Sequence, residues 1–255
     1  MNKILSIVTV NYNSGRNYKK TVESLLPFLA FEEVEFIVID GGSHDASFGD
    51  IKDTSKKIDH LVVERDGGIY DAMNKGIKIS TGRWLWFVNC GDIVSCNSEQ
   101  LLQFLSLEVE GNLIYSDVCT AGGEIKMKFS LGFFMRSALN HQNMIYRREL
   151  LADGFNLKYR ICSDYQHTLS HYNEIVPLKY RECLCTYSLD GVSSEVSKAR
   201  RVQVWRERCE AQMTLPKNYM VKYVMVSFSL IVYLIKCIAP ELGSLTAKKL
   251  KDRGV

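Results

Sequence analysis

The stretch Phe-Ile-Val-Ile-Asp-Gly-Gly-Ser-His-Asp, residues 36–45, decides the fold. Its first four residues are apolar, and three of them are β-branched, which predicts a short buried strand. The polar residues that follow, from Asp40 to Asp45, are typical of a turn and end that strand. We therefore expect a strand that delivers two carboxylates at its carboxyl end.

The same pattern recurs on both sides of this stretch. Three further apolar runs predict strands at residues 4–10, 61–63 and 84–88, and they are followed by polar runs at 11–15, 64–68 and 89–92. Apolar residues at helical spacing predict helices after the first strand and over residues 69–79. The alternation predicts an α/β fold, a Rossmann-like and mostly parallel sheet with helices on both faces. Ligands of such sheets bind outside the carboxyl ends of the strands.

The second half of the chain is less regular. A strand is expected at 113–115, a turn at Gly122-Gly123 and a helix over 163–172, so the sheet should become mixed. Eight scattered cysteines without a Cys-x-x-Cys pair predict reduced thiols, with Cys183 and Cys185 on one face of a strand as core thiols.

Composition restricts the class of protein. The 255 residues are 46% apolar and 24% charged, enough for one large domain or two small ones, and no Gly/Ser-rich or Pro-rich linker occurs. The first residues lack the pattern of a signal peptide, which predicts a cytoplasmic protein. From Val196 onward twelve Lys/Arg face four Asp/Glu, a balance of +8 within a total of +3, so the preceding part carries −5. The acidic part before Val196 and the basic part that follows should have different partners.

Four acidic clusters, around Asp40, Asp66, Asp92 and Asp164, indicate the chemistry. Carboxylates that crowd together repel one another, and a bound cation relieves the repulsion. Oxygen ligands without a His/Cys cluster favour Mg²⁺ or Mn²⁺, which complete their shells with substrate phosphates. A nucleoside diphosphate substrate follows. Each aspartate taken alone is equally explained as a helix cap or turn residue.

Several of these stretches resemble a known family. Residues 9–13 (Thr-Val-Asn-Tyr-Asn) and 38–45 (Val-Ile-Asp-Gly-Gly-Ser-His-Asp) resemble the opening of family 2 glycosyltransferases. Residues 64–76 (Glu-Arg-Asp-Gly-Gly-Ile-Tyr-Asp-Ala-Met-Asn-Lys-Gly) and 87–92 (Phe-Val-Asn-Cys-Gly-Asp) are similar to the colanic-acid and O-antigen type enzymes of bacterial polysaccharide assembly. The resemblance spans roughly residues 3–193. It implies the glycosyltransferase-A fold in a catalytic domain over 1–195, with a nucleotide-sugar-binding half (1–95) and an acceptor half (96–195).

The resemblance also implies roles for individual residues. The expected nucleotide-sugar-binding residues are Thr9, Asn11, Tyr12, Asp40, Asp66, Asn74, Gly91 and His141. Asp92 matches the last acidic residue of a DxD-type metal motif, whose earlier acidic positions are occupied here by Asn89 and Gly91, so it is the one expected metal ligand. Asp164 matches the general base.

Each of these roles has a plainer alternative. Residues 89–92 also suit a simple β-turn, Asp164 suits a helix N-cap, and His141 suits a structural hydrogen bond. Arg147 and Arg148 are either diphosphate contacts or solvated surface residues. Gly191-Val192-Ser193 stands where the family closes its acceptor half, and a plain turn explains it equally well.

The segment 196–255 is expected to form a tail of amphipathic helices. Thirteen uncharged residues between Lys222 and Lys236 make only ~20 Å of helix, whereas a bilayer core needs ~30 Å. Lys222, Ser229 and Lys236, spaced by seven, would form one polar stripe, which suits a helix lying in a membrane interface with basic residues near anionic lipid. Packing on the catalytic domain or in a dimer interface is the alternative. No nucleic-acid-binding motif accompanies the basic residues.

Together these inferences predict an inverting glycosyltransferase at the inner face of the cell membrane. It would move a sugar from a nucleoside diphosphate sugar, UDP-sugar being favoured over GDP-sugar, to a lipid-linked saccharide acceptor in surface polysaccharide assembly. A homodimer is left open. The competing hypothesis is a non-catalytic, membrane-bound sugar-nucleotide-binding subunit. The first strand is not followed by the Gly-rich loop of a sugar nucleotidyltransferase, and a G-x-G-x-x-G dinucleotide motif is absent.

Overall fold

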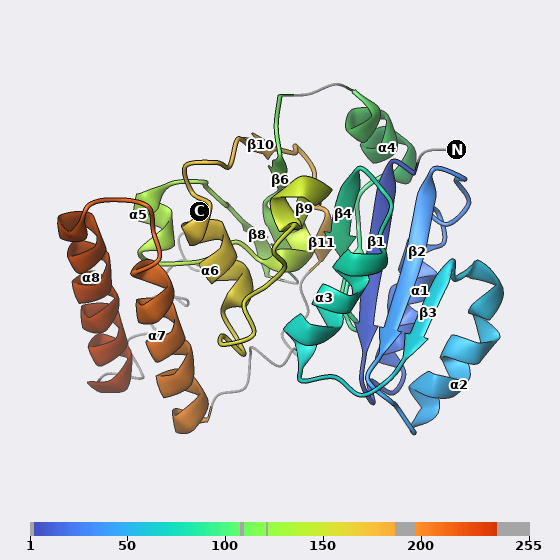
Figure 1. Cartoon of the computed structure of the whole chain (residues 1–255), viewed down its shortest axis with the longest axis horizontal. Helices are drawn as coiled ribbons and strands as arrows, with labels where there is room; N and C mark the ends of the chain where they lie inside the picture. The colour runs from blue at the N-terminus through green and yellow to red at the C-terminus, as the bar shows by residue number, and fades with distance from the viewer. Residues whose placement is uncertain (1–2, 108–109, 121, 187–196, 239–255) are drawn as a thin grey trace.

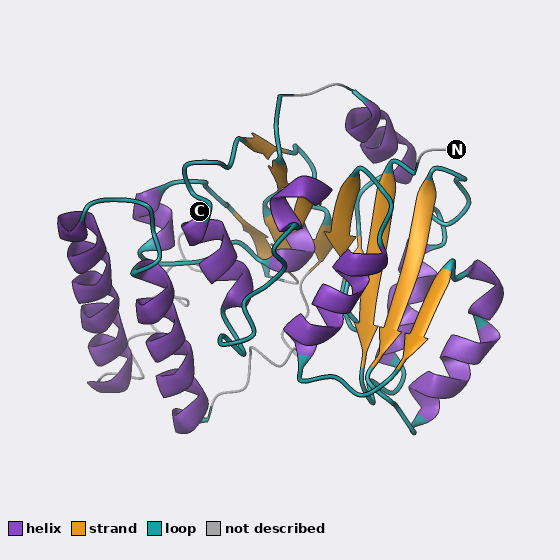
Figure 2. Cartoon of the chain, in the orientation of Figure 1, coloured by secondary structure: helices purple, strands orange, loops and turns teal. Residues whose placement is uncertain are grey.

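A seven-stranded sheet forms the centre of the computed structural model, which describes residues 3–107, 110–120, 122–186 and 197–238. The strand order is β10-β6-β9-β4-β1-β2-β3 (Figure 2). Its members are β1 (Leu5–Asn11), β2 (Val34–Asp40), β3 (His60–Val63), β4 (Trp84–Phe87), β6 (Leu113–Tyr115), β9 (Met144–Arg147) and β10 (Pro177–Lys179). β1, β2, β3 and β4 pair in parallel, whereas β9 runs antiparallel to both its neighbours. The predicted, mostly parallel sheet is confirmed.

Helices cover both faces of this sheet, as predicted. One face packs against α1 (Asn17–Leu25), α2 (Ala46–Asp53) and α4 (Ser98–Ser106), and the other against α3 (Ile69–Ile79) and α6 (Ser163–Ser170). Alternate residues of each strand point to opposite cores: Ile7 packs on one side and Val8 on the other. Short elements complete this part of the chain: η1 (Ser55–Lys57), α5 (Leu131–Phe134), η2 (His141–Asn143) and η3 (Arg148–Leu151).

The chain also forms a second sheet, which has four strands. Its order is β5-β11-β7-β8, formed by Ile93–Val94, Cys185–Thr186, Val118–Thr120 and Gly123–Ile125. Gly123 has φ +120° where β7 turns into β8, in the region that favours glycine. The predicted turn and the mixed second half are both confirmed.

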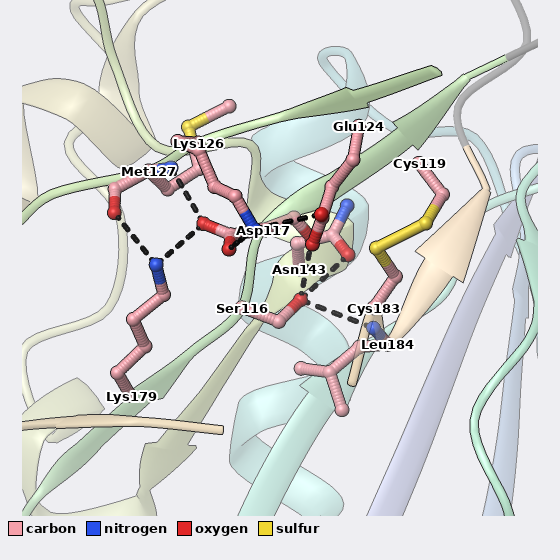
Figure 3. A network of polar contacts seen from close by, with 10 residues as sticks. All are labelled: Ser116, Asp117, Cys119, Glu124, Lys126, Met127, Asn143, Lys179, Cys183 and Leu184. Atoms are coloured by element: carbon pink, nitrogen blue, oxygen red, sulfur yellow. Dashed lines mark hydrogen bonds and ion pairs between the residues drawn. A yellow bond between two sulfur atoms is a disulfide. The ribbon is translucent and has the colours of Figure 1, made fainter. Parts of the chain in front are cut away.

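A disulfide joins Cys119 of β7 to Cys183, next to the polar network around Asp117 (Figure 3). The prediction that every cysteine is a reduced thiol is therefore wrong, and Cys183 is not a core thiol beside the buried Cys185. The bond was not predictable because the two cysteines lie 64 residues apart and meet only when the second sheet forms.

Two long helices lie beyond α6, at the end of the molecule farthest from β3 (Figure 1). They are α7 (Lys198–Gln212) and α8 (Tyr219–Ile238). Within the described part of the chain, none of the helices has the length and apolar character needed to cross a membrane. Gly191-Val192-Ser193, the side chain of Lys236 and residues 239–255 lie outside the description.

The two described side chains of the polar stripe of α8, Lys222 and Ser229, bond to α7 and its C-terminal end instead of facing outward as predicted. Ser229 is buried and bonded to Gln212 of α7, with 2.7 Å between the Gln212 Nε2 and Ser229 Oγ atoms. The Lys222 ammonium donates to the Met213 carbonyl instead of reaching outward. Polar groups of the stripe therefore satisfy the α7–α8 contact, and the opposite side of α8 is exposed. We define this outer face of α8 by its exposed apolar residues, Tyr219, Met220, Tyr223, Val224, Leu230, Ile231 and Leu234.

Acid should destabilise the fold through His167 of α6. Burial lowers the pKa of this imidazole from 6.5 to about 4, and the ring of His171, stacked at 4.3 Å, acts in the same direction. Above pH 6.5 both states are neutral, and below it the unfolded chain takes the proton first. The free energy of unfolding should therefore fall between pH 6.5 and 4, by up to about 3 kcal/mol.

Urea unfolding at a series of pH values measures this contribution. His167→Gln keeps a donor for the Leu150 carbonyl, which the imidazole Nε2 reaches at 2.9 Å, and lacks the titration. The variant should lose less stability than the native chain in this window. Equal slopes for the two proteins would show that His167 does not carry the effect.

Reduction of the Cys119–Cys183 bond should also lower stability. Closing a loop of this length restricts the unfolded chain and contributes roughly 4 kcal/mol in the chain-entropy model. Dithiothreitol should lower the melting temperature of the native chain and leave that of Cys119→Ser unchanged. Thiol titration of the denatured, unreduced protein should find two thiols fewer than after reduction. Equal thiol counts would contradict the disulfide.

Candidate active site

The carboxyl ends of β1 and β2 meet in a closed polar cluster. Asn11 and Asp40 are opposite one another in the parallel register, and the Asn11 amide donates to the Asp40 carboxylate at 2.6 Å. The other Asp40 oxygen accepts from the backbone N–H groups of Gly42 and Ser43 at 3.0 and 2.7 Å. Asp40 is fully buried. Its carboxylate is thus occupied in shaping the loop after β2.

The neighbouring Asp45 fastens this loop to the one after β1. Its carboxylate accepts from the Ser47 N–H at 3.1 Å, which caps α2, and from the Gly15 N–H at 2.7 Å. The hydrogen bond from the Ser47 hydroxyl is the largest influence that lowers the pKa of Asp45. The carboxylate remains charged and holds two loops together.

Tyr12 and Asp66 come together over Gly41. A Cβ atom at Gly41 would lie 2.5 Å from the Asp66 Oδ2 atom and 3.1 Å from the Tyr12 Cδ2 atom, so a larger residue here would displace these two side chains. Tyr12 is 63% exposed, which leaves an aromatic surface beside a carboxylate. Thr9, by contrast, is buried and donates to the Val88 carbonyl at 2.7 Å. The structure therefore gives Thr9 a role in holding β1 to the end of β4.

Residues 89–92 form a tight turn that directs the side chain of Asp92. The Asp92 N–H donates to the Asn89 carbonyl at 2.9 Å, and the Asn89 N–H donates to the Asp92 carboxylate at 3.0 Å. Gly91 has φ +104°, and its N–H donates to the Thr21 hydroxyl of α1 at 2.9 Å. Residues 89–92 thus form the β-turn of the alternative prediction. This turn places the Asp92 side chain at the end of β4.

His141 lies between the two principal carboxylates. Its Nε2 atom is 3.9 Å from the Asp92 Oδ2 atom, and its Nδ1 atom is 3.8 Å from the Asp164 Oδ2 atom. The Asn89 side-chain nitrogen is 2.8 Å from the same Nε2. The structure therefore assembles Asn89, Asp92, His141 and Asp164 from three separate segments of the chain.

Two contacts fix the segment η2 that carries His141. The Trp86 indole of β4 donates to the Gln142 carbonyl at 2.8 Å. The Asn143 side-chain oxygen accepts from the Ser116 hydroxyl at 2.9 Å (Figure 3). It also accepts from the Cys185 N–H at 3.0 Å. His141 is thus positioned by the main sheet on one side and the second sheet on the other.

Asp164 belongs to the first turn of α6. The cap position is Cys162, so the alternative that Asp164 is the N-cap is wrong. The Asp164 Oδ1 atom accepts from the Tyr70 hydroxyl at 2.9 Å and from the Tyr165 N–H at 2.8 Å. Its Oδ2 atom is the one that faces His141. One carboxylate oxygen is therefore held by the protein, and the other is directed into the site.

Other predicted residues lie elsewhere. The Asn74 amide is engaged with the backbone of Phe155, and binding of a nucleotide sugar by Asn74 stays a prediction. The Arg147 guanidinium stacks on Trp84, at the start of β4, 4.3 Å from the ring centre. Arg148 reaches toward the Ser80 carbonyl. Both arginines are therefore at the amino end of β4, away from Asp92.

Sequence reasoning missed Tyr70 and Glu207. Tyr70 stands within the motif at 64–76, and only its contact with Asp164 distinguishes it. Glu207 of α7 is buried and accepts from the backbone N–H groups of Ile161 and Cys162 at 2.8 and 3.0 Å. No local pattern in the basic helix marks this residue. The first helix of the predicted tail therefore supports the loop before Asp164.

The environment of Asp92 fits a divalent cation. Burial raises the pKa of Asp92, opposed by His141 and by the Asn89 N–H, which shows a carboxylate short of stabilising charge. The Asn89 Oδ1 atom is buried and without a hydrogen-bond partner in the described ranges. Those ranges hold no cluster of three or more His, Cys, Asp or Glu suited to a metal. These oxygens suit Mg²⁺ or Mn²⁺ with substrate phosphates completing the shell.

Comparison with protein families and curated sequences gives consistent results. Residues 6–108 match the model of glycosyl transferase family 2. An uncharacterized glycosyltransferase of Mycobacterium tuberculosis is 28% identical over 201 residues, which cover 74% of this chain and 77% of the relative. A PGL/p-HBAD biosynthesis glycosyltransferase of Mycobacterium bovis is 26% identical over 169 residues, covering 59% and 66%.

Solved structures share the fold. TarS 1-349 of S. aureus in complex with UDP has a TM-score of 0.66 at 18% identity, covering 89% of this chain and 70% of that chain. The mannosyltransferase PcManGT of Pyrobaculum calidifontis, in complex with GDP-Man and Mn²⁺, has a TM-score of 0.64 at 12% identity, covering 98% and 80%. The predicted glycosyltransferase-A fold is confirmed.

Proposed function

We propose that this chain, which belongs to glycosyl transferase family 2, transfers a sugar from a nucleoside diphosphate sugar to an acceptor hydroxyl with inversion. The observation that carries the proposal is the array Asp92–His141–Asp164. It places a carboxylate suited to a cation and a carboxylate suited to proton transfer on opposite sides of one imidazole.

The cluster at the ends of β1 and β2 would bind the donor. Tyr12 offers an exposed ring for the base, beside Asp66, on a loop shaped by Asn11 and Asp40. Fold relatives described with UDP, UDP-GlcNAc and GDP-Man support a sugar nucleotide as ligand. We infer a UDP-sugar before a GDP-sugar. Asp92 and the Asn89 Oδ1 atom would hold Mg²⁺ or Mn²⁺, which supplies positive charge to the departing diphosphate.

Asp164 would act as the general base. As the acceptor oxygen forms its bond to the anomeric carbon, the bond from that carbon to the diphosphate breaks on the opposite side, which inverts the configuration. The acceptor proton passes to the Asp164 Oδ2 atom, the oxygen that faces the site. The Oδ1 atom keeps its hydrogen bonds to Tyr70 and to the Tyr165 N–H throughout.

The acceptor is proposed to be a lipid-linked saccharide at the inner face of the membrane. Support comes from the outer face of α8, whose exposed residues are mostly apolar, and from the Lys and Arg residues of the neighbouring α7. An exposed apolar helix face next to a basic helix suits a membrane interface that contains anionic lipid. Enzyme and acceptor would then meet at the same surface.

Turnover with a panel of UDP-, GDP- and dTDP-sugars tests the catalytic proposal. Membranes carrying lipid-linked saccharides serve as the acceptor source, and released nucleotide is the readout. One donor should be consumed, and EDTA should abolish release until Mn²⁺ or Mg²⁺ is restored.

Asp164→Asn should lower kcat about 100-fold or more while nucleotide binding survives, because the proton acceptor is lost. Asp53→Asn, at the exposed end of α2, is the matched control and should behave as the native protein. Metal-dependent nucleotide binding without turnover by any donor would favour the non-catalytic binding subunit.

Flotation with vesicles tests membrane attachment. The native chain should float with phosphatidylglycerol-containing vesicles and less with pure phosphatidylcholine. Tyr223→Glu combined with Ile231→Glu should abolish flotation without a change in melting temperature, since both side chains are exposed. Leu107→Glu with Val176→Glu, also exposed apolar positions, is the control. A native protein that stays with the buffer and sediments as a dimer, converted to a monomer by the α8 variant, would assign the face to self-association.

A further inference from the structure

We propose that Tyr70 is a positioning residue for Asp164, and that one face of α3 holds the base at a fixed place relative to the donor site. The inference rests on the proposed function, since it assigns a role in the same reaction. It concerns a residue in the nucleotide-binding half that acts on a group of the acceptor half.

The hydroxyl of Tyr70 contacts the base directly. Its oxygen is 2.9 Å from the Asp164 Oδ1 atom and 2.8 Å from the Ile161 carbonyl oxygen. A phenol has one proton to donate, and a carboxylate is a stronger acceptor than a carbonyl. The Tyr70 hydroxyl and the Tyr165 N–H both donate hydrogen bonds to the Oδ1 atom of Asp164. These bonds restrict rotation of the carboxylate, so its Oδ2 atom stays directed toward His141.

The surroundings keep this hydroxyl protonated. Tyr70 is buried, and its ring packs against Phe155 with centres 5.4 Å apart. Burial raises the pKa of Tyr70 well above its usual value, and the neighbouring Asp164 adds to the effect. The side chain therefore remains a donor over the whole range in which an enzyme works.

Asn74 binds the start of the segment 155–164, whose end contacts Tyr70. It lies four residues after Tyr70, on the same face of α3. Its amide donates to the Phe155 carbonyl at 2.8 Å and accepts from the Phe155 N–H at 2.7 Å. Gly154 has φ +67°, and a Cβ there would lie 2.8 Å from the Asn74 Oδ1 atom. The approach of the loop to α3 therefore requires glycine at this point.

These contacts make α3 a bridge between the two halves of the site. The helix follows the loop that carries Asp66, and the segment 155–164 leads into the base. Misplacing a reacting group by about 1 Å costs on the order of 100-fold in rate. The hydroxyl of Tyr70 should consequently affect the chemical step and leave donor binding almost unchanged.

Tyr70→Phe removes only the hydroxyl. At saturating donor, kcat should fall roughly 10- to 100-fold, the range of a hydrogen bond to a charged group. The KM for the donor and the Kd for the free nucleotide should stay within about twofold. Tyr18→Phe is the matched control, because Tyr18 is a buried tyrosine in the core on the opposite face of the sheet and bonds only to Thr54 among the contacts described, at 2.8 Å. Its kcat should match the native value.

Two further measurements separate positioning from a purely structural role. In the Asp164→Asn background, Tyr70→Phe should add little to the loss, because both changes act on one unit. Asn74→Ala should also lower kcat with nucleotide affinity unchanged, and it decides the matter should Tyr70→Phe fail to fold.

Results that contradict the role of Tyr70 can be told apart from the result that contradicts the proposed function. If the Tyr70→Phe protein has the native kcat and a lower melting temperature, the hydroxyl contributes only to stability. A raised donor KM or nucleotide Kd for Tyr70→Phe or Asn74→Ala, with kcat intact, would assign this face of α3 to donor binding. Both results overturn the inference while the proposed function stands. Absence of turnover by the native chain with every donor would instead remove the proposed function itself.

Discussion

The close approach of α3 to β1 is the constraint on which the site depends. A Cβ atom at Gly76 would lie 2.5 Å from the Val8 Cγ1 atom, so the helix can rest on the strand only because this residue has no side chain. Glycine inside a helix costs about 1 kcal/mol relative to alanine. The close packing of this helix on the sheet places Tyr70 in contact with Asp164 and Asn74 in contact with Phe155.

The acidic residues of the site are not equivalent, although the sequence presents them as similar clusters. Asp40 and Asp45 are surrounded by amide and hydroxyl donors, so neither needs a cation. Asp164 receives a hydroxyl and an N–H. Asp92 has one N–H and an imidazole at 3.9 Å. Asp92 therefore differs from the other carboxylates because burial, and not crowding by a second carboxylate, leaves its charge poorly stabilised.

The sequence predicted the parts of the molecule whose signals are local. The strand ending at Asp40 and the helix Ile69–Ile79 follow from apolar periodicity and from the turn residues that end each run. The antiparallel insertion of β9, the Cys119–Cys183 bond and the role of Glu207 depend on contacts between residues far apart in the chain, and no short window encodes them. The polar stripe of α8 was visible, but its spacing cannot tell a solvent-facing stripe from one that faces a neighbouring helix.

The helix pair α7–α8 is joined to the segment that carries Asp164 by buried polar groups. The Gln212 amide of α7 is bonded to Ser229 of α8 at 2.7 Å and to the hydroxyl of Tyr165, the residue after Asp164, at 3.1 Å. Glu207 holds the loop that precedes it. Moving α8 away from α7 would break the contact between Gln212 and Ser229, and a buried polar group left unpaired costs about 1–3 kcal/mol. The buried chain Tyr165–Gln212–Ser229 therefore fixes the orientation of α8, and with it that of its outer face, relative to Asp164.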